Sequence, residues 1–177
     1  MAPGDNGIIY DVPMFGVFVG LSRNGSGGGL MFFKLGLADP FDTNSPNGTT
    51  FVTAGGGAMG THATDSLQNA YGAAKAIMSE QRNDYLDKAH LHLNVVSAGG
   101  YNKVGPSGGL AEASPTSQWQ KAKIRPRCVM TGHLTLLGAV LRVGSMPEKI
   151  KAACNAQMLY LVLPEANREE YESRRIL

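Results

Sequence analysis

Gly105-Pro106-Ser107-Gly108-Gly109 surrounds a serine with small residues, which predicts a tight and exposed turn. On such a turn the backbone N–H of the serine can face an incoming carbonyl group. Lys149 follows 42 positions later, in the helix-like segment Gly144-Ser145-Met146-Pro147-Glu148-Lys149-Ile150-Lys151. A lysine on that helix can act as the base for the serine. The two stretches therefore predict a hydrolase with a Ser-Lys dyad, which needs neither histidine nor metal.

The composition is that of one ordinary globular domain. With 177 residues, 43% of them hydrophobic, we expect a single domain over 1–177, in which 1–7 and 171–177 are peripheral. A formal net charge of +2 gives no reason to expect a nucleic acid or an anionic membrane as partner. No stretch approaches the ~20 apolar residues of a membrane span, and the start lacks the charged and apolar regions of a signal peptide. We therefore expect a soluble intracellular protein.

The apolar pattern predicts an α+β fold, with a hairpin-rich β half followed by mixed β and α. Apolar runs at 17–19 and 30–37 flank a Gly-rich break and predict a hairpin. We expect a helix over 64–83 and a strand over 90–96. Further on, the pattern predicts strands at 129–130 and 134–143, a helix over 148–156, a buried strand over 159–163 and a polar helix over 168–175.

Two other motifs are weaker candidates for a site. Gly55-Gly56-Gly57-Ala58-Met59-Gly60 satisfies G-x-G-x-x-G, but the acidic partner expected about 20 positions on would be Glu80, inside the predicted helix. A loop entering a helix is therefore favoured over a nucleotide site. His90 and His92 could face the same side of a strand, yet no third ligand has suitable spacing, so we expect no metal.

The two cysteines, Cys128 and Cys154, are too few for a disulfide framework. Each lies in an apolar or helical setting, and we interpret both as inert, buried thiols.

Several ordered stretches resemble the proteolytic domain of Lon proteases. The serine turn resembles the family's nucleophile motif G-P-S-A-G, and residues 130–138 are similar to M-T-G-E-I-T-L-R-G. Residues 140–149 follow V-L-P-I-G-G-L-K-E-K, whose last lysine is the catalytic one, and 163–168 resemble I-P-E-E-N-R. The resemblance covers about residues 17–170.

The resemblance implies a serine endopeptidase that cleaves extended or unfolded protein substrates through an acyl-enzyme. Ser107 would be the nucleophile, Lys149 the general base, and the Thr131 hydroxyl would orient the lysine. Backbone groups at Ser107, Gly108 and Gly105 would form the oxyanion site. No cofactor is implied for this chain, and ATP would matter only if a separate ATPase module exists. A homo-oligomeric ring and a location in the cytoplasm or the mitochondrial matrix are also implied.

Three departures from the family pattern motivate other hypotheses. Val104 stands where the family usually has an acidic residue, His133 replaces a glutamate, and Pro115 is expected to break the helix after the serine. A catalytically inactive Lon-like assembly or protein-binding module is therefore the second hypothesis. A viral polyprotein-processing protease of birnavirus type, which shares the dyad but lacks the ATPase, is another.

Chemistry sets one further requirement. A general base must be neutral, and an exposed lysine titrates near ~10.4, so burial must lower the pKa of Lys149 by about 2–3 units.

Overall fold

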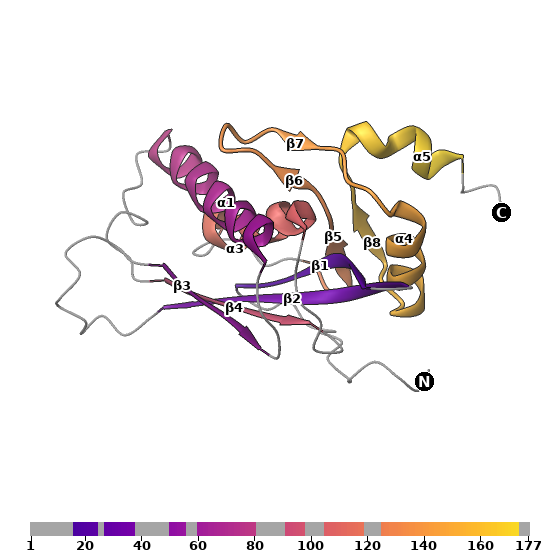
Figure 1. Cartoon of the computed structure of the whole chain (residues 1–177), viewed down its shortest axis with the longest axis horizontal. Coiled ribbons are helices and arrows are strands. Elements are labelled where there is room, and N and C mark those ends of the chain that lie inside the picture. The colour runs from indigo at the N-terminus through magenta and orange to yellow at the C-terminus, as the bar shows by residue number, and fades with distance from the viewer. Residues whose placement is uncertain are drawn as a thin grey trace.

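The computed structural model describes residues 16–24, 27–37, 50–55, 60–80, 91–97, 105–118 and 125–173. A six-stranded sheet has the order β3-β4-β2-β1-β5-β8 (Figure 1). Its strands are β1 (Val17–Asn24), β2 (Gly27–Leu37), β3 (Thr50–Gly55), β4 (Leu91–Ser97), β5 (Cys128–Met130) and β8 (Tyr160–Val162). A separate hairpin is formed by β6 (His133–Leu134) and β7 (Val140–Leu141).

The helices are α1 (Thr61–Glu80), α3 (Gly109–Gln118), α4 (Met146–Asn155) and α5 (Arg168–Glu172), with short 3-10 helices η1 (Pro106–Gly108) and η2 (Glu165–Asn167). Figure 1 shows α1 and α3 together above one half of the sheet, and α4 and α5 at the other end. In the described part of the chain, no helix is long and apolar enough to cross a membrane.

The sheet is mixed. β1 and β2 form the antiparallel hairpin that the sequence predicts, with Val17 opposite Lys34 and Asn24 opposite Gly27. β2 also pairs antiparallel with β4, whereas β3 pairs parallel with β4, and β5 pairs parallel with both β1 and β8. Strands of both directions beside segregated helices confirm the predicted α+β class.

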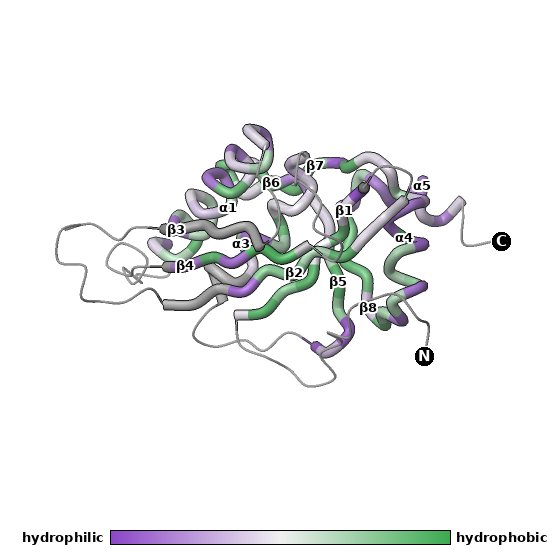
Figure 2. The backbone as a smooth tube through the Cα atoms, turned by 60° about the horizontal axis from the view of Figure 1, so that its bottom comes forward, coloured by the Kyte–Doolittle hydropathy of each residue, from purple (hydrophilic) through white to green (hydrophobic). Residues whose placement is uncertain are grey.

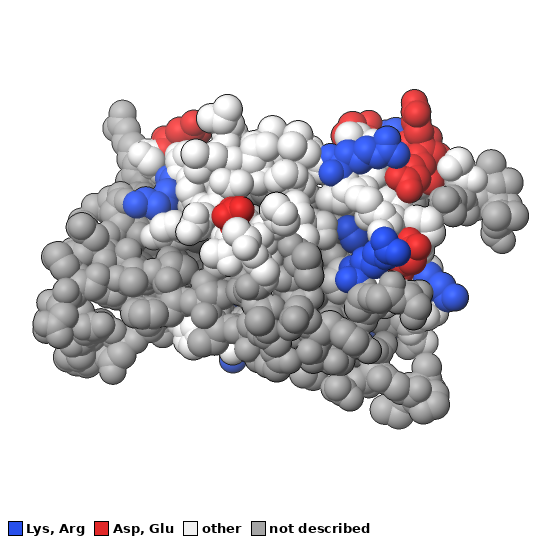
Figure 3. All heavy atoms as spheres, in the orientation of Figure 1, with Lys and Arg blue, Asp and Glu red and all other residues white. Residues whose placement is uncertain are grey.

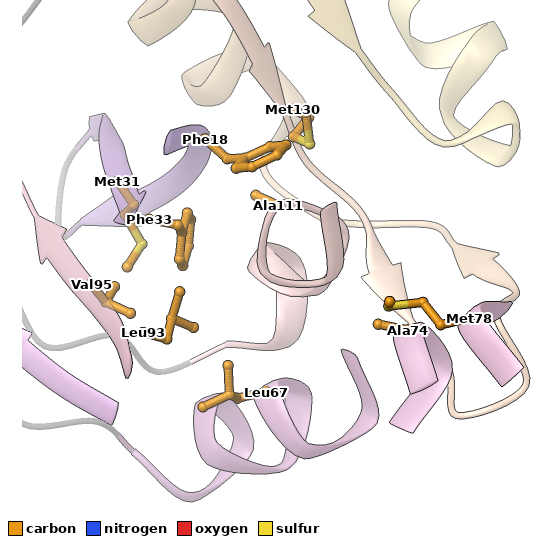
Figure 4. Packing of buried hydrophobic residues seen from close by; sticks show 10 residues of the cluster. All are labelled: Phe18, Met31, Phe33, Leu67, Ala74, Met78, Leu93, Val95, Ala111 and Met130. Atoms are coloured by element: carbon orange, nitrogen blue, oxygen red, sulfur yellow. The ribbon is translucent and has the colours of Figure 1, made fainter. Parts of the chain in front are cut away.

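The central strands are buried on both faces, because successive side chains of a strand point to opposite sides. Phe18 of β1 and Met130 of β5 join the cluster beneath α1 and α3. Val19 and Val129, their neighbours in sequence, join the cluster beneath α4. Figure 4 shows the first cluster, and Figure 2 shows that the central strands are the most hydrophobic part of the backbone.

Helix α1 begins at Thr61, three residues before the expected start, and Gly60 O accepts hydrogen bonds from the backbone N–H groups of Ala63 and Thr64. Its buried face has helical spacing, as predicted. The buried residues of the helix are Ala63, Ser66, Leu67, Ala70, Ala73, Ala74 and Met78. The expected last turn, 81–83, lies outside the described residues.

Two expectations about strands are corrected. The run 134–143 does not form one strand, because it turns at Gly138, which has a φ of 83°, and returns as β7. The strand β8 is not buried, because it ends the order of strands: Tyr160 and Val162 are 43% and 42% exposed.

The expectation for Pro115 is also wrong, because α3 continues through this position to Gln118. A proline inside a helix removes one hydrogen bond and crowds the preceding turn. Ala111 and Ala113 of α3 are buried, and Ala113 joins Ala70 and Ala73 of α1 in a cluster of its own. We infer that this packing outweighs the local cost of the proline.

The cysteines are less buried than expected: Cys128 is half-buried and Cys154 is exposed. On α4 the buried face carries Met146, Lys149 and Ala153. Cys154 is one position beyond Ala153, so it is turned about 100° away from that face.

Opposite charges meet at the C-terminal end of the described chain. Arg168 Nε donates to Glu165 Oε1 at 2.6 Å, and Arg142 Nη2 donates to Glu170 Oε2 at 3.1 Å. Figure 3 shows acidic and basic side chains together over α5. Arg142, Arg168 and Glu165 are exposed and Glu170 is half-buried, so each pair lies at the surface and contributes little to stability.

Candidate active site

The serine turn is a single turn of 3-10 helix that leads directly into α3. Gly105 is extended, with a φ of −100° and a ψ of 163°, and Pro106 then starts η1. Ser107 is half-buried at the second position of this turn. Because the first N–H groups of a helix have no acceptor within it, those of Ser107 and Gly108 are available to an oxygen of a bound group.

Gly109 explains why the turn can lie so close to its neighbours. A Cβ atom at this position would be 2.9 Å from the backbone N of Leu134 and 3.1 Å from Ser66 Oγ. The absence of a side chain therefore lets α3 start directly against β6 and α1. By contrast, a Cβ on Gly105 would meet nothing within 4 Å.

Lys149 is buried although it is a lysine, with 2% of its surface exposed. It lies on the inner face of α4, three residues after Met146, which is fully buried. Burial lowers the pKa of Lys149 from 10.5 to about 8. The neutral amine that a general base requires is therefore accessible near neutral pH. Lys151 is exposed, as expected for a position that faces away from Lys149.

Thr131 connects the lysine to the serine turn. Lys149 Nζ donates to Thr131 Oγ1 at 3.2 Å, and Thr131 Oγ1 donates to the backbone oxygen of Ser107 at 3.0 Å. The backbone N–H of Gly132 donates to the same oxygen at 3.0 Å. Thr131 itself is fully buried, directly after β5. Ser107, Thr131 and Lys149, which the sequence analysis selected, thus lie in one hydrogen-bonded group.

Asn167 was not selected from the sequence, yet it fixes the segment that leads into α4. Its Oδ1 accepts from the backbone N–H of Val143 at 3.0 Å, and its Nδ2 donates to the Val143 carbonyl at 2.9 Å. The side chain is fully buried. An asparagine three residues after Pro164 was the available signal, but nothing in the sequence showed that it pairs with position 143.

Ser66 and Glu112 form a second buried polar group that the sequence analysis missed. The Ser66 hydroxyl is shared between Pro106 O, at 3.1 Å, and Glu112 Oε2, at 2.9 Å. Each residue is only 1% exposed. The signal for Glu112 was a lone carboxylate between alanines in a helix that packs inward.

The remaining candidates lie elsewhere. His133 is half-buried on β6 and His92 half-buried on β4, and Val104 and His90 fall outside the described residues. Within the described ranges, no group of three His, Cys, Asp or Glu residues could hold a metal ion. Of the glycine-rich segment 55–60, the structure describes only the two ends. Gly55 is the last residue of β3, and Gly60 directly precedes α1.

In this α+β fold, Thr131 joins a buried lysine to a half-buried serine turn, and a serine with a lysine as base can carry out acyl transfer. The sequence comparisons identify the family. Residues 7–174 match the Lon protease (S16) C-terminal proteolytic domain. The chain belongs to this family.

Curated relatives match over nearly the whole chain. The chain is 34% identical to "Lon protease homolog, mitochondrial" of Neurospora crassa, over 92% of this chain and 14% of that protein. It is 32% identical to the Homo sapiens protein of the same name, over 92% of this chain and 17% of the relative. It is 33% identical to "Lon protease homolog 3, mitochondrial" of Arabidopsis thaliana, over 93% of this chain and 17% of that protein. The chain thus spans about a sixth of the length of these relatives.

Proposed function

We propose that this chain is a serine endopeptidase in which Ser107 is the nucleophile and Lys149 the general base. The observation that carries the proposal is the buried Lys149, whose pKa is lowered to about 8 and whose amine is bonded through Thr131 to the serine turn. A lysine on the solvent-facing side of the helix, with no role in a site, would be exposed, as Lys151 is. Family membership supports the same assignment.

In the first half of the reaction, neutral Lys149 Nζ accepts the proton of the Ser107 hydroxyl as Oγ attacks the carbonyl carbon of the peptide bond. The carbonyl oxygen becomes an oxyanion, which the backbone N–H groups of Ser107 and Gly108 stabilise. The extended backbone of Gly105 leaves room for the substrate beside them. The Lys149 ammonium then gives its proton to the departing amine, and an acyl-enzyme remains.

In the second half, water attacks the carbonyl carbon of the acyl-enzyme while neutral Lys149 accepts a proton from it. The Lys149 ammonium then gives this proton to Ser107 Oγ as the ester bond breaks, which releases the acid product and restores the serine and the neutral lysine. Thr131 acts as a positioning residue throughout, because its hydroxyl contacts both Lys149 Nζ and the backbone oxygen of Ser107.

We infer that the substrate binds as an extended segment of an unfolded protein. Strand β8 supports this, because it ends the sheet order among the described strands and presents Tyr160 and Val162 at its surface. Its last residue lies beside the site, since Val162 O accepts the backbone N–H of Thr131 at 3.1 Å. An edge strand can pair with a peptide through the main chain, which gives affinity with loose sequence selectivity.

The wider assembly is part of the proposal and rests on the resemblance to the Lon family. The relatives are about six times longer than this chain, and we propose that a ring of subunits and an ATPase partner would control access to the site rather than its chemistry. Cleavage of an already unfolded substrate should need no ATP. The relatives carry mitochondrial names, which supports a mitochondrial matrix location over the cytoplasm.

The decisive experiment is cleavage of casein without ATP from pH 7 to 10, together with labelling of the chain by a fluorophosphonate probe. The wild type should be labelled and should cleave, with activity rising to a plateau around a midpoint near pH 8, because the neutral fraction of Lys149 grows with pH. Ser107→Ala and Lys149→Ala should each reduce activity by about 10³-fold or more. The matched control is Lys151→Ala, which removes an exposed lysine of the same helix.

Equal activity in all the variants would contradict the dyad. A wild type that neither cleaves nor reacts with the probe would instead favour the inactive assembly module.

A further inference from the structure

Two peptide groups carry the N–H donors of the proposed oxyanion site, and the carbonyl oxygen of each is held by a buried hydroxyl. The carbonyl of Ser107 belongs to the same planar unit as the N–H of Gly108, and Thr131 and Gly132 donate to it. The carbonyl of Pro106 belongs to the same planar unit as the N–H of Ser107. That carbonyl accepts from the backbone N–H of Gly109 and lies 3.1 Å from Ser66 Oγ.

Peptide planarity makes these contacts directional. In a trans peptide the C=O and N–H bonds point in opposite directions, so fixing one fixes the other. A hydrogen bond accepted by the carbonyl also polarises the N–H of the same unit. Ser66 therefore orients the N–H of Ser107 in the same way that Thr131 orients the N–H of Gly108, by holding the carbonyl of the same peptide unit.

Ser66 comes from α1, 40 positions before Pro106, so its hydroxyl must be held accurately to reach the turn. A serine hydroxyl can rotate freely unless a partner holds it. Glu112 of α3 provides that partner, with Oε2 2.9 Å from Ser66 Oγ. The hydroxyl hydrogen of Ser66 lies within hydrogen-bond reach of both Pro106 O and Glu112 Oε2, so the two acceptors together restrict the rotation of the hydroxyl.

A buried carboxyl is costly, so its retention beside a catalytic turn calls for a reason. We propose that Ser66, held by Glu112, is a positioning residue that aims the Ser107 N–H at the oxyanion of the tetrahedral intermediate. The inference rests on the proposed function of Ser107 as the nucleophile. It adds a role for two residues outside the proposed dyad.

The test compares Ser66→Ala, Glu112→Met and Glu112→Gln with Ser114→Ala. Met removes the hydrogen bond of Glu112 while roughly keeping its volume, whereas the Gln amide can still bond Ser66. Ser114→Ala is the control, because it deletes another hydroxyl of the same region, which bonds Leu110 O of α3 and lies 3.4 Å from Met130 Sδ of β5.

We expect Ser66→Ala and Glu112→Met to lower kcat about 10-fold at unchanged KM, since the oxyanion exists only in the transition state and intermediate. Glu112→Gln and Ser114→Ala should stay within about 2-fold of the wild type. A second readout does not depend on activity. The ¹⁵N chemical shift of the Ser107 amide should move in Ser66→Ala, because the hydrogen bond to the preceding carbonyl is lost, and in Glu112→Met, because the hydroxyl that makes this bond is no longer held; it should not move in the control.

Rates and amide shift that stay at wild-type values in Ser66→Ala overturn the proposal. So does a fall in kcat that Ser114→Ala reproduces equally, because that would reflect general loosening of α3. If the wild type itself proves inactive, the proposed function fails, and an unmoved Ser107 shift would overturn the positioning role as well. A moved shift in the inactive chain would still support Ser66 as the residue that orients this peptide.

Discussion

Thr131 lies between the two halves of the proposed dyad, and its hydroxyl bonds both Lys149 Nζ and the backbone oxygen of Ser107. Replacing it with valine keeps the shape and removes the contacts with Lys149 Nζ and Ser107 O. A lost hydrogen bond to a charged or reacting group costs about 1.5–3 kcal/mol, and each 1.4 kcal/mol is tenfold in rate. Thr131→Val should therefore lower kcat about 10- to 100-fold.

Thr131→Ser is the matched variant, because it restores the hydroxyl without the methyl group, and it should recover most of the rate. The measurement is kcat for a peptide substrate at pH 9. Full activity in Thr131→Val would contradict the positioning role of the hydroxyl, and a loss in Thr131→Ser as large as that in Thr131→Val would show that the methyl group is needed as well.

Ser145 has a backbone conformation that suits glycine, with a φ of 58° and a ψ of 40° just before α4. A non-glycine residue in this left-handed region costs roughly 1–2 kcal/mol. Glycine removes this cost, but part of the gain is offset because the unfolded chain with glycine has more conformational entropy to lose on folding. Ser145→Gly should therefore raise the free energy of unfolding by about 0.5–1 kcal/mol in urea denaturation. The control is Ser173→Gly, at a φ of −60°, where the same change should destabilise.

At the scale of elements, Asn167 ties the C-terminal segment to the residues that lead into α4. Asn167→Ala would leave the N–H and C=O of Val143 buried without this partner, and each such group costs about 1–3 kcal/mol. We expect a loss of about 2–4 kcal/mol in chemical denaturation and a lower melting temperature. Asn155→Ala on the exposed side of α4 is the control, with a change within about 0.5 kcal/mol. A loss no larger than that of the control would contradict this account of Asn167.

The elements also show how far the sequence could predict the fold. The hairpin β1–β2, the helix α1 and the helix α4 follow from local periodicity, and all three were predicted to within a few residues. The continuation of α3 through Pro115 and the exposure of β8 could not be predicted, because each depends on which elements lie beside it. Local pattern determines which residues face inward, but it does not show which strand ends the sheet.

The same distinction holds for the candidate site. Ser107, Thr131 and Lys149 stand in motifs whose order and spacing are visible in the chain, so they could be selected beforehand. Ser66 and Glu112 are 46 positions apart and meet only because α1 and α3 pack together. No periodicity connects two polar residues on different helices. Contacts of this kind become visible only in the folded structure.

For the whole molecule, the buried lysine couples the proposed chemistry to global stability. Lys149 has a pKa of about 8 when folded and an ordinary value of 10.5. Between these pH values the unfolded chain binds more protons than the folded chain, so the free energy of unfolding rises with pH. Below pH 8 the folded chain bears the full cost of burying the charge, which is about 3 kcal/mol for a shift of this size.

Lys149→Met removes that cost and should abolish activity. It should raise the free energy of unfolding by about 2–3 kcal/mol at pH 7, and by about 2 kcal/mol less at pH 10, where the wild-type lysine is neutral in the folded chain and has begun to lose its proton in the unfolded chain. Urea denaturation at the two pH values measures the difference, with the exposed Lys151→Met as control. If Lys149→Met stabilised the chain no more at pH 7 than at pH 10, the lysine would not be titrating in a buried site, and the pH dependence proposed for catalysis would lose its physical basis.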